Sequence, residues 1–237
     1  MKSKRLIKSL PILFFLIILV QPWKTLSQPI LVLEENMQRN FYCEADISVI
    51  EDGNRSDLLY LINRKGNIIK ISFDLSSFID DSYEAENLKK LGINSNTVLY
   101  DMDDLLVYFI FPDIQSYVIQ SFDPEDSLFD FTFFSDKKNY KYEKVFESSE
   151  NQNNRFSIRI KHKQGTDDWA GYILESVRYM NFPVKAELYS EKRDVKLIFN
   201  FRNISFEDNG DELLPPGGYK KFDNYTQMLI YAIERQK

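Results

Sequence analysis

The chain has 237 residues, of which 43% are hydrophobic and 28% charged, and its formal net charge is -6. This balance is typical of a globular protein and excludes a disordered or fibrous chain. An acidic protein is repelled by nucleic acid, so nucleic acid is excluded as a partner. Aromatic residues make up 15% of the chain, while Gly and Pro number only 8 each. Because aromatic side chains suit a half-buried pleated surface, this composition favours β-sheet.

The first 27 residues have the parts of an export signal. Four Lys and Arg side chains lie within the first eight residues, an apolar run covers residues 10–20, and Thr25 and Ser27 precede the expected cleavage point. The run is shorter than the ~20 apolar residues that a bilayer crossing needs. We therefore expect residues 1–27 to be a signal peptide and residues 28–237 to form one exported domain. An uncleaved N-terminal anchor is the alternative.

Removal of the signal would take away five positive charges and move the formal charge from -6 to -11. The single Cys43 excludes an internal disulfide, and no cysteine lies just after the apolar run to carry a lipid. A bacterial periplasmic protein does not need disulfides, whereas a eukaryotic secreted domain is more often rich in cysteine. The expected location is therefore the periplasm or cell envelope.

The first half of the exported chain predicts a short helix, several strands and a second helix. The short helix is expected over residues 30–40. Strands are expected between residues 41 and 74, with turns at Asp52-Gly53-Asn54 and Lys65-Gly66-Asn67. Residues 80–93 predict a helix that ends at Gly92. Strands follow at residues 98–100, 105–111 and 117–122, with a turn at Pro112-Asp113.

The second half repeats this pattern. Residues 124–147 are ambiguous, and the polar residues 148–155 predict a loop. Alternation of apolar and polar residues predicts a strand over residues 156–161. Further strands are expected at residues 172–179, 184–189, 195–201 and 204–206. Apolar residues at helical spacing predict a short helix over residues 225–236. With no internal repeat or long linker, one curved antiparallel sheet with a few helices is expected.

The residues that carry most enzyme and metal chemistry are scarce. His162 is the only histidine, and no nucleophile or metal ligand is spaced to it, so we expect neither a catalytic residue nor a metal. Asp101, Asp103 and Asp104 lack the spacing of a calcium loop and predict a solvated turn. The glycosylation triplets at Asn54, Asn203 and Asn224 are of a kind that arises often by chance.

Three C-terminal features occur in a recognisable order. They are Phe182-Pro183-Val184 at a strand start, then Asn203-Ile204-Ser205-Phe206, then the turn Pro215-Pro216-Gly217-Gly218-Tyr219-Lys220. Together they resemble the close of the outer-membrane lipoprotein-sorting (LolA-like) family. The resemblance covers roughly residues 30–223. It places Arg64 near a functionally sensitive arginine of the family, although Lys65 stands where the family usually has proline.

The resemblance implies an α+β fold that is mainly antiparallel β. The expected form is an incomplete, unclosed β-barrel or strongly curved sheet with a few covering helices around an apolar cavity. Burial of an acyl chain in such a cavity yields about 0.8 kcal/mol per CH₂. The alternative is that the aromatic rings fill a closed core. The expected cavity residues are Leu59, Leu61, Arg64, Ile69, Ile71, Leu106, Tyr108, Ile110, Val118, Phe131, Phe133, Ile158, Ile173, Leu197 and Phe199.

The function implied is that of a periplasmic carrier. It would bind lipoprotein acyl chains or another amphiphile and move them between membrane-bound donor and acceptor proteins, as a monomer without a cofactor. Two alternatives remain open. One is a non-transporting envelope domain of the same fold that senses or scaffolds. The other is a secreted hydrolase that uses paired carboxylates.

Overall fold

The computed structural model describes residues 40–78, 82–101, 103–121, 140–162, 168–190, 194–207 and 213–235. Four sequence-based expectations lie outside these ranges: the signal peptide, the helix before residue 40, and the cavity residues Phe131 and Phe133. Within them, no helix is both long and apolar enough to span a bilayer.

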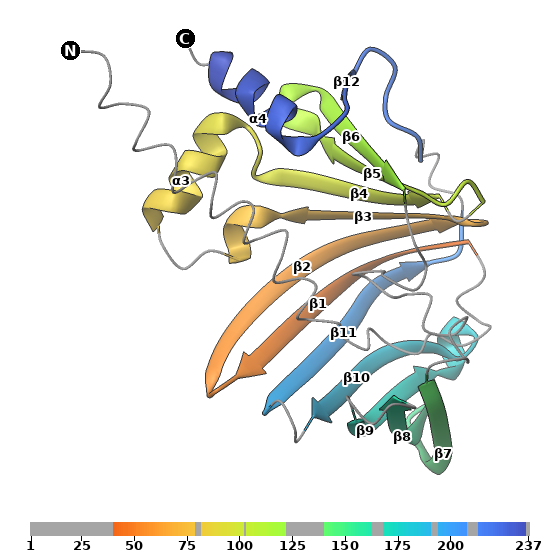
Figure 1. Ribbon diagram of the computed structural model, residues 1–237. Coiled ribbons are helices and arrows are strands. Elements are labelled where there is room, and N and C mark those ends of the chain that lie inside the picture. The colour runs from red at the N-terminus through yellow and green to blue at the C-terminus, as the bar shows by residue number, and fades with distance from the viewer. Residues whose placement is uncertain are drawn as a thin grey trace.

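The described residues form one open sheet of twelve strands (Figure 1). The strand order is β12-β6-β5-β4-β3-β2-β1-β11-β10-β9-β8-β7, and every neighbouring pair is antiparallel except β12 with β6. The predicted mainly antiparallel, unclosed and strongly curved sheet with few helices is therefore confirmed. The strands are β1 Phe41–Glu51, β2 Asn54–Lys65, β3 Ile68–Asp74, β4 Ser95–Asp101, β5 Leu106–Phe111, β6 Ser116–Ser121, β7 Tyr140–Glu150, β8 Asn153–His162, β9 Asp168–Ser176, β10 Phe182–Ser190, β11 Val195–Ser205 and β12 Lys220–Phe222.

Two-residue turns join the first three strands. Asp52 and Gly53 both have positive φ, which is the type I′ geometry that suits the twist of a hairpin. Gly66 has positive φ at the first central position of the next turn, as type II′ requires. Both turns lie where the sequence predicts them. They fix the register of β2 against β1 and against β3.

Two predictions about the second half need correction. The loop expected over residues 148–155 is only the two-residue turn Asn151–Gln152, because both residues adopt positive φ and let β7 and β8 pair almost to their ends. The strands expected at residues 195–201 and 204–206 are one continuous strand, β11, which stays paired with β1 as far as Ser205. Residues 177–179 form the short 3₁₀ helix η4, so β9 ends at Ser176.

Two α-helices are described, and both were predicted. They are α3 Ser82–Leu91, which ends before Gly92 with positive φ, and α4 Tyr225–Glu234. The Asn224 side chain caps α4 by accepting a hydrogen bond of 3.0 Å from the Gln227 amide. Both helices pack at the β5–β6 end of the sheet (Figure 1), where Leu88, Met228 and Leu229 bury against Phe111 and Val118.

The main hydrophobic core lies on one face of the sheet, which we call the inner face. It carries alternate residues of β1 to β5 and β8 to β11, including Cys43, Ala45, Tyr60, Ile71, Trp169, Phe182, Leu197 and Phe199. No residue of α3 or α4 belongs to this cluster. The opposite, outer face carries more polar side chains. There Glu187 joins three strands through Lys185 (2.9 Å), Lys196 (2.8 Å) and the Tyr172 hydroxyl (2.5 Å).

Candidate ligand-binding site between β2 and β3

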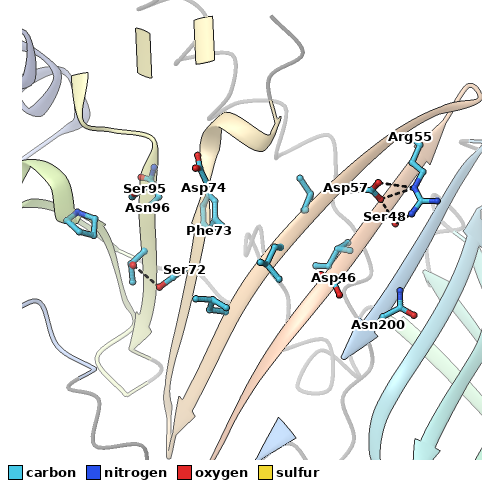
Figure 2. Close-up of a pocket in the computed structure, with 16 residues that line it drawn as sticks. Asp46, Ser48, Arg55, Asp57, Ser72, Phe73, Asp74, Ser95, Asn96 and Asn200 are labelled. Atoms are coloured by element: carbon cyan, nitrogen blue, oxygen red, sulfur yellow. Dashed lines mark hydrogen bonds and ion pairs between the residues drawn. The ribbon is translucent and has the colours of Figure 1, made fainter. Parts of the chain in front are cut away.

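Strands β2 and β3 pair along only part of their length, and β2 has 12 residues whereas β3 has only 7. β1 pairs with β2 from Asn54 to Arg64, whereas β3 pairs with it only from Leu61 to Lys65. The ladder between β2 and β3 ends at Leu61 and Ser72. Beyond that pair, β2 curves away from β3, and the two strands open a wedge (Figures 1 and 2).

Asp74 is the last residue of β3, and after it the chain leaves the ladder with β4. Its Oδ1 atom accepts hydrogen bonds from the Ser76 backbone amide (2.7 Å) and the Ser76 hydroxyl (2.6 Å). Such local side-chain bonds to the backbone compete with strand pairing. The Leu75 amide then donates to the Asn94 carbonyl (2.7 Å), and the chain enters the short 3₁₀ helix η2, Leu75–Phe78, which contacts β2.

The wedge holds a pocket of about 760 Å³, which we call the split pocket (Figure 2). Ligand pockets in proteins usually measure about 300–1,000 Å³, so this volume suits a small molecule or a part of a larger one. Its lining comes from β1, β2, β3, β4, β11 and the 3₁₀ helix η3, Pro112–Ile114. The residues that line it are Asp46, Ile47, Ser48, Arg55, Asp57, Leu58, Leu59, Leu61, Ser72, Phe73, Asp74, Ser95, Asn96, Thr97, Pro112 and Asn200.

The split pocket contains apolar side chains that are partly exposed. Leu59 is 44% exposed and Leu61 is 38% exposed, although both lie in the middle of a long strand. Their side chains are on the outer face, since the alternate residues Leu58, Tyr60 and Ile62 belong to the inner core. Phe73 contributes an aromatic surface and packs with its ring centroid 5.5 Å from that of Tyr60. The pocket therefore offers apolar area to a guest.

A polar network lies at one side of this apolar area (Figure 2). The Asp57 carboxylate accepts a hydrogen bond of 2.5 Å from the Ser48 hydroxyl and two from Arg55 Nε, at 2.8 and 3.1 Å. Arg55 Nη2 also donates to the Ser48 oxygen (3.0 Å). The Ser48 hydrogen bond, followed by the Arg55 contacts, lowers the pKa of Asp57 below its usual value of 3.8. At neutral pH the network is a charged ion pair held in place by a hydroxyl.

Several other polar groups of the lining are held by hydrogen bonds within the protein. Ser72 and Thr97 share a hydrogen bond of 2.8 Å between their hydroxyls. The buried Asn96 donates from Nδ2 to the Ile93 carbonyl (2.8 Å). Asp46 accepts from Arg202 Nη2 (3.2 Å), which links the pocket to β11. These bonds fix the pocket wall in place and leave the apolar floor as its open part.

The cavity residues predicted from the sequence divide between the two faces of the sheet. Leu59 and Leu61 line the split pocket, and Leu106, Tyr108 and Ile110 share their outer face but lie on β5, with β3 and β4 between. The inner face carries Ile69, Ile71, Val118, Ile158, Ile173, Leu197 and Phe199, which are all at most 5% exposed. Of the described candidates, the structure therefore brings only Leu59 and Leu61 into the split pocket.

Arg64 lies on the inner face near the β2–β3 turn, where its Nε donates to the Gly66 carbonyl (3.0 Å). Burial lowers the pKa of Arg64. This position is at the paired end of β2, away from the split pocket.

Sequence reasoning missed Phe73, Arg55 and Asp57 as pocket residues. Phe73 alternates with Ile71 in a pattern that predicts a strand, but the pattern does not show where the ladder with β2 stops. The Asp74-x-Ser76 pair is a local signal for the end of β3, two residues after the ladder with β2 stops, because Asp and Ser form such turns readily. Across the described ranges, no group of three His, Cys, Asp or Glu side chains is placed to hold a metal ion.

No protein-family model and no curated protein matches this chain. Solved structures do match. PNGF-II matches at 5% sequence identity and a TM-score of 0.38, and the match covers 83% of this chain. MucB matches at 13% sequence identity and a TM-score of 0.36, and that match covers 79% of this chain. The chain spans only 33% of the PNGF-II chain and 60% of the MucB chain.

A domain described as an outer membrane lipoprotein-sorting protein, from Vibrio parahaemolyticus, matches at 8% identity and a TM-score of 0.37. That match covers 74% of this chain and 88% of the other. The matched structures thus include the family that the C-terminal stretch resembles. With TM-scores below 0.5, they assign no activity to this chain, whose function must be inferred from its own residues.

Proposed function

We propose that this protein is an exported carrier that binds the acyl part of an amphiphile in the split pocket. The observation that carries the proposal is the pair of half-exposed leucines, Leu59 and Leu61, on the floor of a pocket of about 760 Å³. The alternate residues of the same strand, Leu58, Tyr60 and Ile62, are buried in the main cluster. The pocket leaves apolar area open to a guest.

The energetics favour a hydrocarbon guest. A volume of 760 Å³ corresponds to on the order of 25 water molecules at ~30 Å³ each. An acyl segment that displaces this water gains about 0.8 kcal/mol for each CH₂ that it buries. Binding of this kind is non-covalent and uses no catalytic residue, so the proposed role is not that of an enzyme.

The polar side of the pocket suits the head of the amphiphile. The guanidinium of Arg55 lies at the edge of the apolar floor, held by Asp57 and Ser48. A carboxylate or ester oxygen of the guest would accept a charge-assisted hydrogen bond there. The resemblance of residues 182–223 to the lipoprotein-sorting family agrees with a lipoprotein acyl chain as the cargo, and the export signal with transport through the cell envelope.

Uptake of a fluorescent fatty acid by delipidated protein tests the proposal. We expect saturable binding that weakens roughly tenfold in the double variant Leu59→Asn/Leu61→Asn, because part of the buried apolar contact is lost. Both side chains are partly exposed, so the variant retains the core. Failure of the unaltered protein to bind, or equal binding by the double variant, would contradict the proposal.

Leu105→Asn is the matched control. Leu105 is 45% exposed, close to the value for Leu59, and it does not line the split pocket. Its φ of 53° is one that Asn adopts readily. We expect this variant to take up the fatty acid as the unaltered protein does.

A further inference from the structure

The backbone of β2 points alternately to its two neighbours, and the turns show which residues point where. Glu51 and Asn54 close a two-residue turn and are therefore a hydrogen-bonded pair, so the even-numbered residues of β2 bond to β1. Lys65 and Ile68 close the next two-residue turn, so the odd-numbered residues face β3. The two turns give the same alternation.

Arg55, Asp57 and Leu59 therefore direct their amide and carbonyl groups into the wedge. The β3 ladder stops at Leu61, and no described strand pairs with these three residues on that side. They lie in the middle of a twelve-stranded sheet, yet they form a local sheet edge. An open edge of this kind is a template for another extended chain.

We propose that this local edge of β2 binds an extended segment of a partner polypeptide by β-strand addition. The segment would run antiparallel to β2 and take the place that a longer β3 would occupy, about 4.8 Å from β2, with η2 displaced where it contacts β2. The inference deepens the proposed function, since it rests on the split pocket as the ligand site and assigns to the cargo a polypeptide portion beside its acyl chain.

The side chains around the edge define the chemistry of the segment. In antiparallel pairing, residues opposite one another share a face of the sheet. The residue opposite Leu59 would be apolar. The residue two positions later would face Asp57 and would be basic, because the pocket lining has three Asp side chains and one Arg. The residue opposite Arg55 would be small and polar or acidic.

The five-residue peptide Leu-Val-Lys-Val-Ser, acetylated at its N-terminus so that the Leu carries an amide, fits this pattern. Titration of the isotope-labelled, delipidated full chain with this peptide, followed by amide NMR shifts, reports on each backbone group. We expect the largest shifts at the amides of Arg55, Asp57 and Leu59. The amides of Ser56 and Leu58 bond to β1 and serve as internal controls. Absence of shifts at the three odd positions would overturn the inference.

Modified peptides test the backbone and the charge separately. N-methylation of the peptide Leu and Lys removes the amides that face β2, and we expect it to weaken binding roughly tenfold or more. N-methylation of the two Val residues should have less effect, because their amides face away. Replacing the peptide Lys with Glu should weaken binding by several-fold through repulsion from Asp57. Equal binding by all four peptides would overturn the inference.

A pair of variants tests the same point from the protein side. Leu59→Pro removes both the side chain and the amide that faces the wedge, and it leaves the ladder to β1 complete. Leu59→Ala removes the side chain alone. We expect the proline variant to bind the peptide roughly fivefold more weakly than the alanine variant. Equal binding by the two variants would contradict the strand addition.

Fatty acid uptake separates this inference from the proposed function. If the protein takes up fatty acid but the peptide gives no shifts on β2, only the strand addition is wrong. If neither ligand binds, both proposals are wrong. The peptide arms need no protein variant, so a folding defect in Leu59→Pro does not remove the test.

Discussion

At the scale of single residues, Asp57 decides how the split pocket responds to pH. As a carboxylate it accepts hydrogen bonds from Ser48 and Arg55, and protonation removes the charge that strengthens them. Its folded pKa is depressed, so the network contributes stability above the usual pKa of 3.8 and loses it as pH falls through the lower folded value. The Arg55 guanidinium should therefore remain held at neutral pH and be released only in acid.

An NMR titration of the Asp57 side-chain carboxyl carbon measures this shift. We expect a midpoint below 3.8 in the unaltered protein and a higher midpoint in Ser48→Ala, because the hydroxyl is the largest cause of the shift. Ser72→Ala removes a hydroxyl of the same pocket that bonds to Thr97 instead, and it should leave the midpoint unchanged. A midpoint at or above 3.8 in the unaltered protein would refute the arrangement.

At the scale of elements, alternation and turn residues predict much of the sheet. The turns at Gly53 and Gly66, helix α3 and the C-terminal helix follow from local patterns. The β7–β8 turn does not, because Asn151 and Gln152 adopt positive φ without a glycine to signal it. The continuity of β11 also depends on pairing with β1, which is distant in the sequence.

The position of the split pocket also depends on contacts between residues that are distant in the sequence. Its existence depends on the different lengths of β2 and β3 and on the curvature of the sheet, and neither is encoded in a short pattern. Leu59 and Leu61 could be picked out as apolar strand residues. Their partial exposure could not, because it results from the absence of a β3 residue beside them.

Gly171 tests how closely β9 and β10 approach. A Cβ atom at this position would lie 1.8 Å from the Glu187 carbonyl oxygen, so an added methyl group forces the two main chains apart. We expect Gly171→Ala to lower the free energy of unfolding by about 3 kcal/mol in urea denaturation. Gly217→Ala is the control, since a Cβ there meets nothing within 4 Å and the residue does not need positive φ. Equal stability of the two variants would contradict this close approach.

At the scale of the whole molecule, the many aromatic rings serve mainly the inner face. Phe182, Phe199 and Trp169 are buried there, and edge-to-face contacts such as Phe41–Phe182, with ring centroids 5.0 Å apart, fill the space between strands. The half-exposed Leu59 and Leu61 lie instead on the outer face, where the sheet splits. The curved sheet thus provides both a packed core and a separate place for a guest.

Photo-crosslinking with a fatty acid that carries a diazirine on its acyl chain tests this account most directly. The account predicts that mass spectrometry of the delipidated, labelled full chain finds the crosslinks on residues 55–61 of β2 and on Phe73. Competition by unlabelled fatty acid should remove them. Crosslinks found only away from the split pocket, or none at all, would contradict the account.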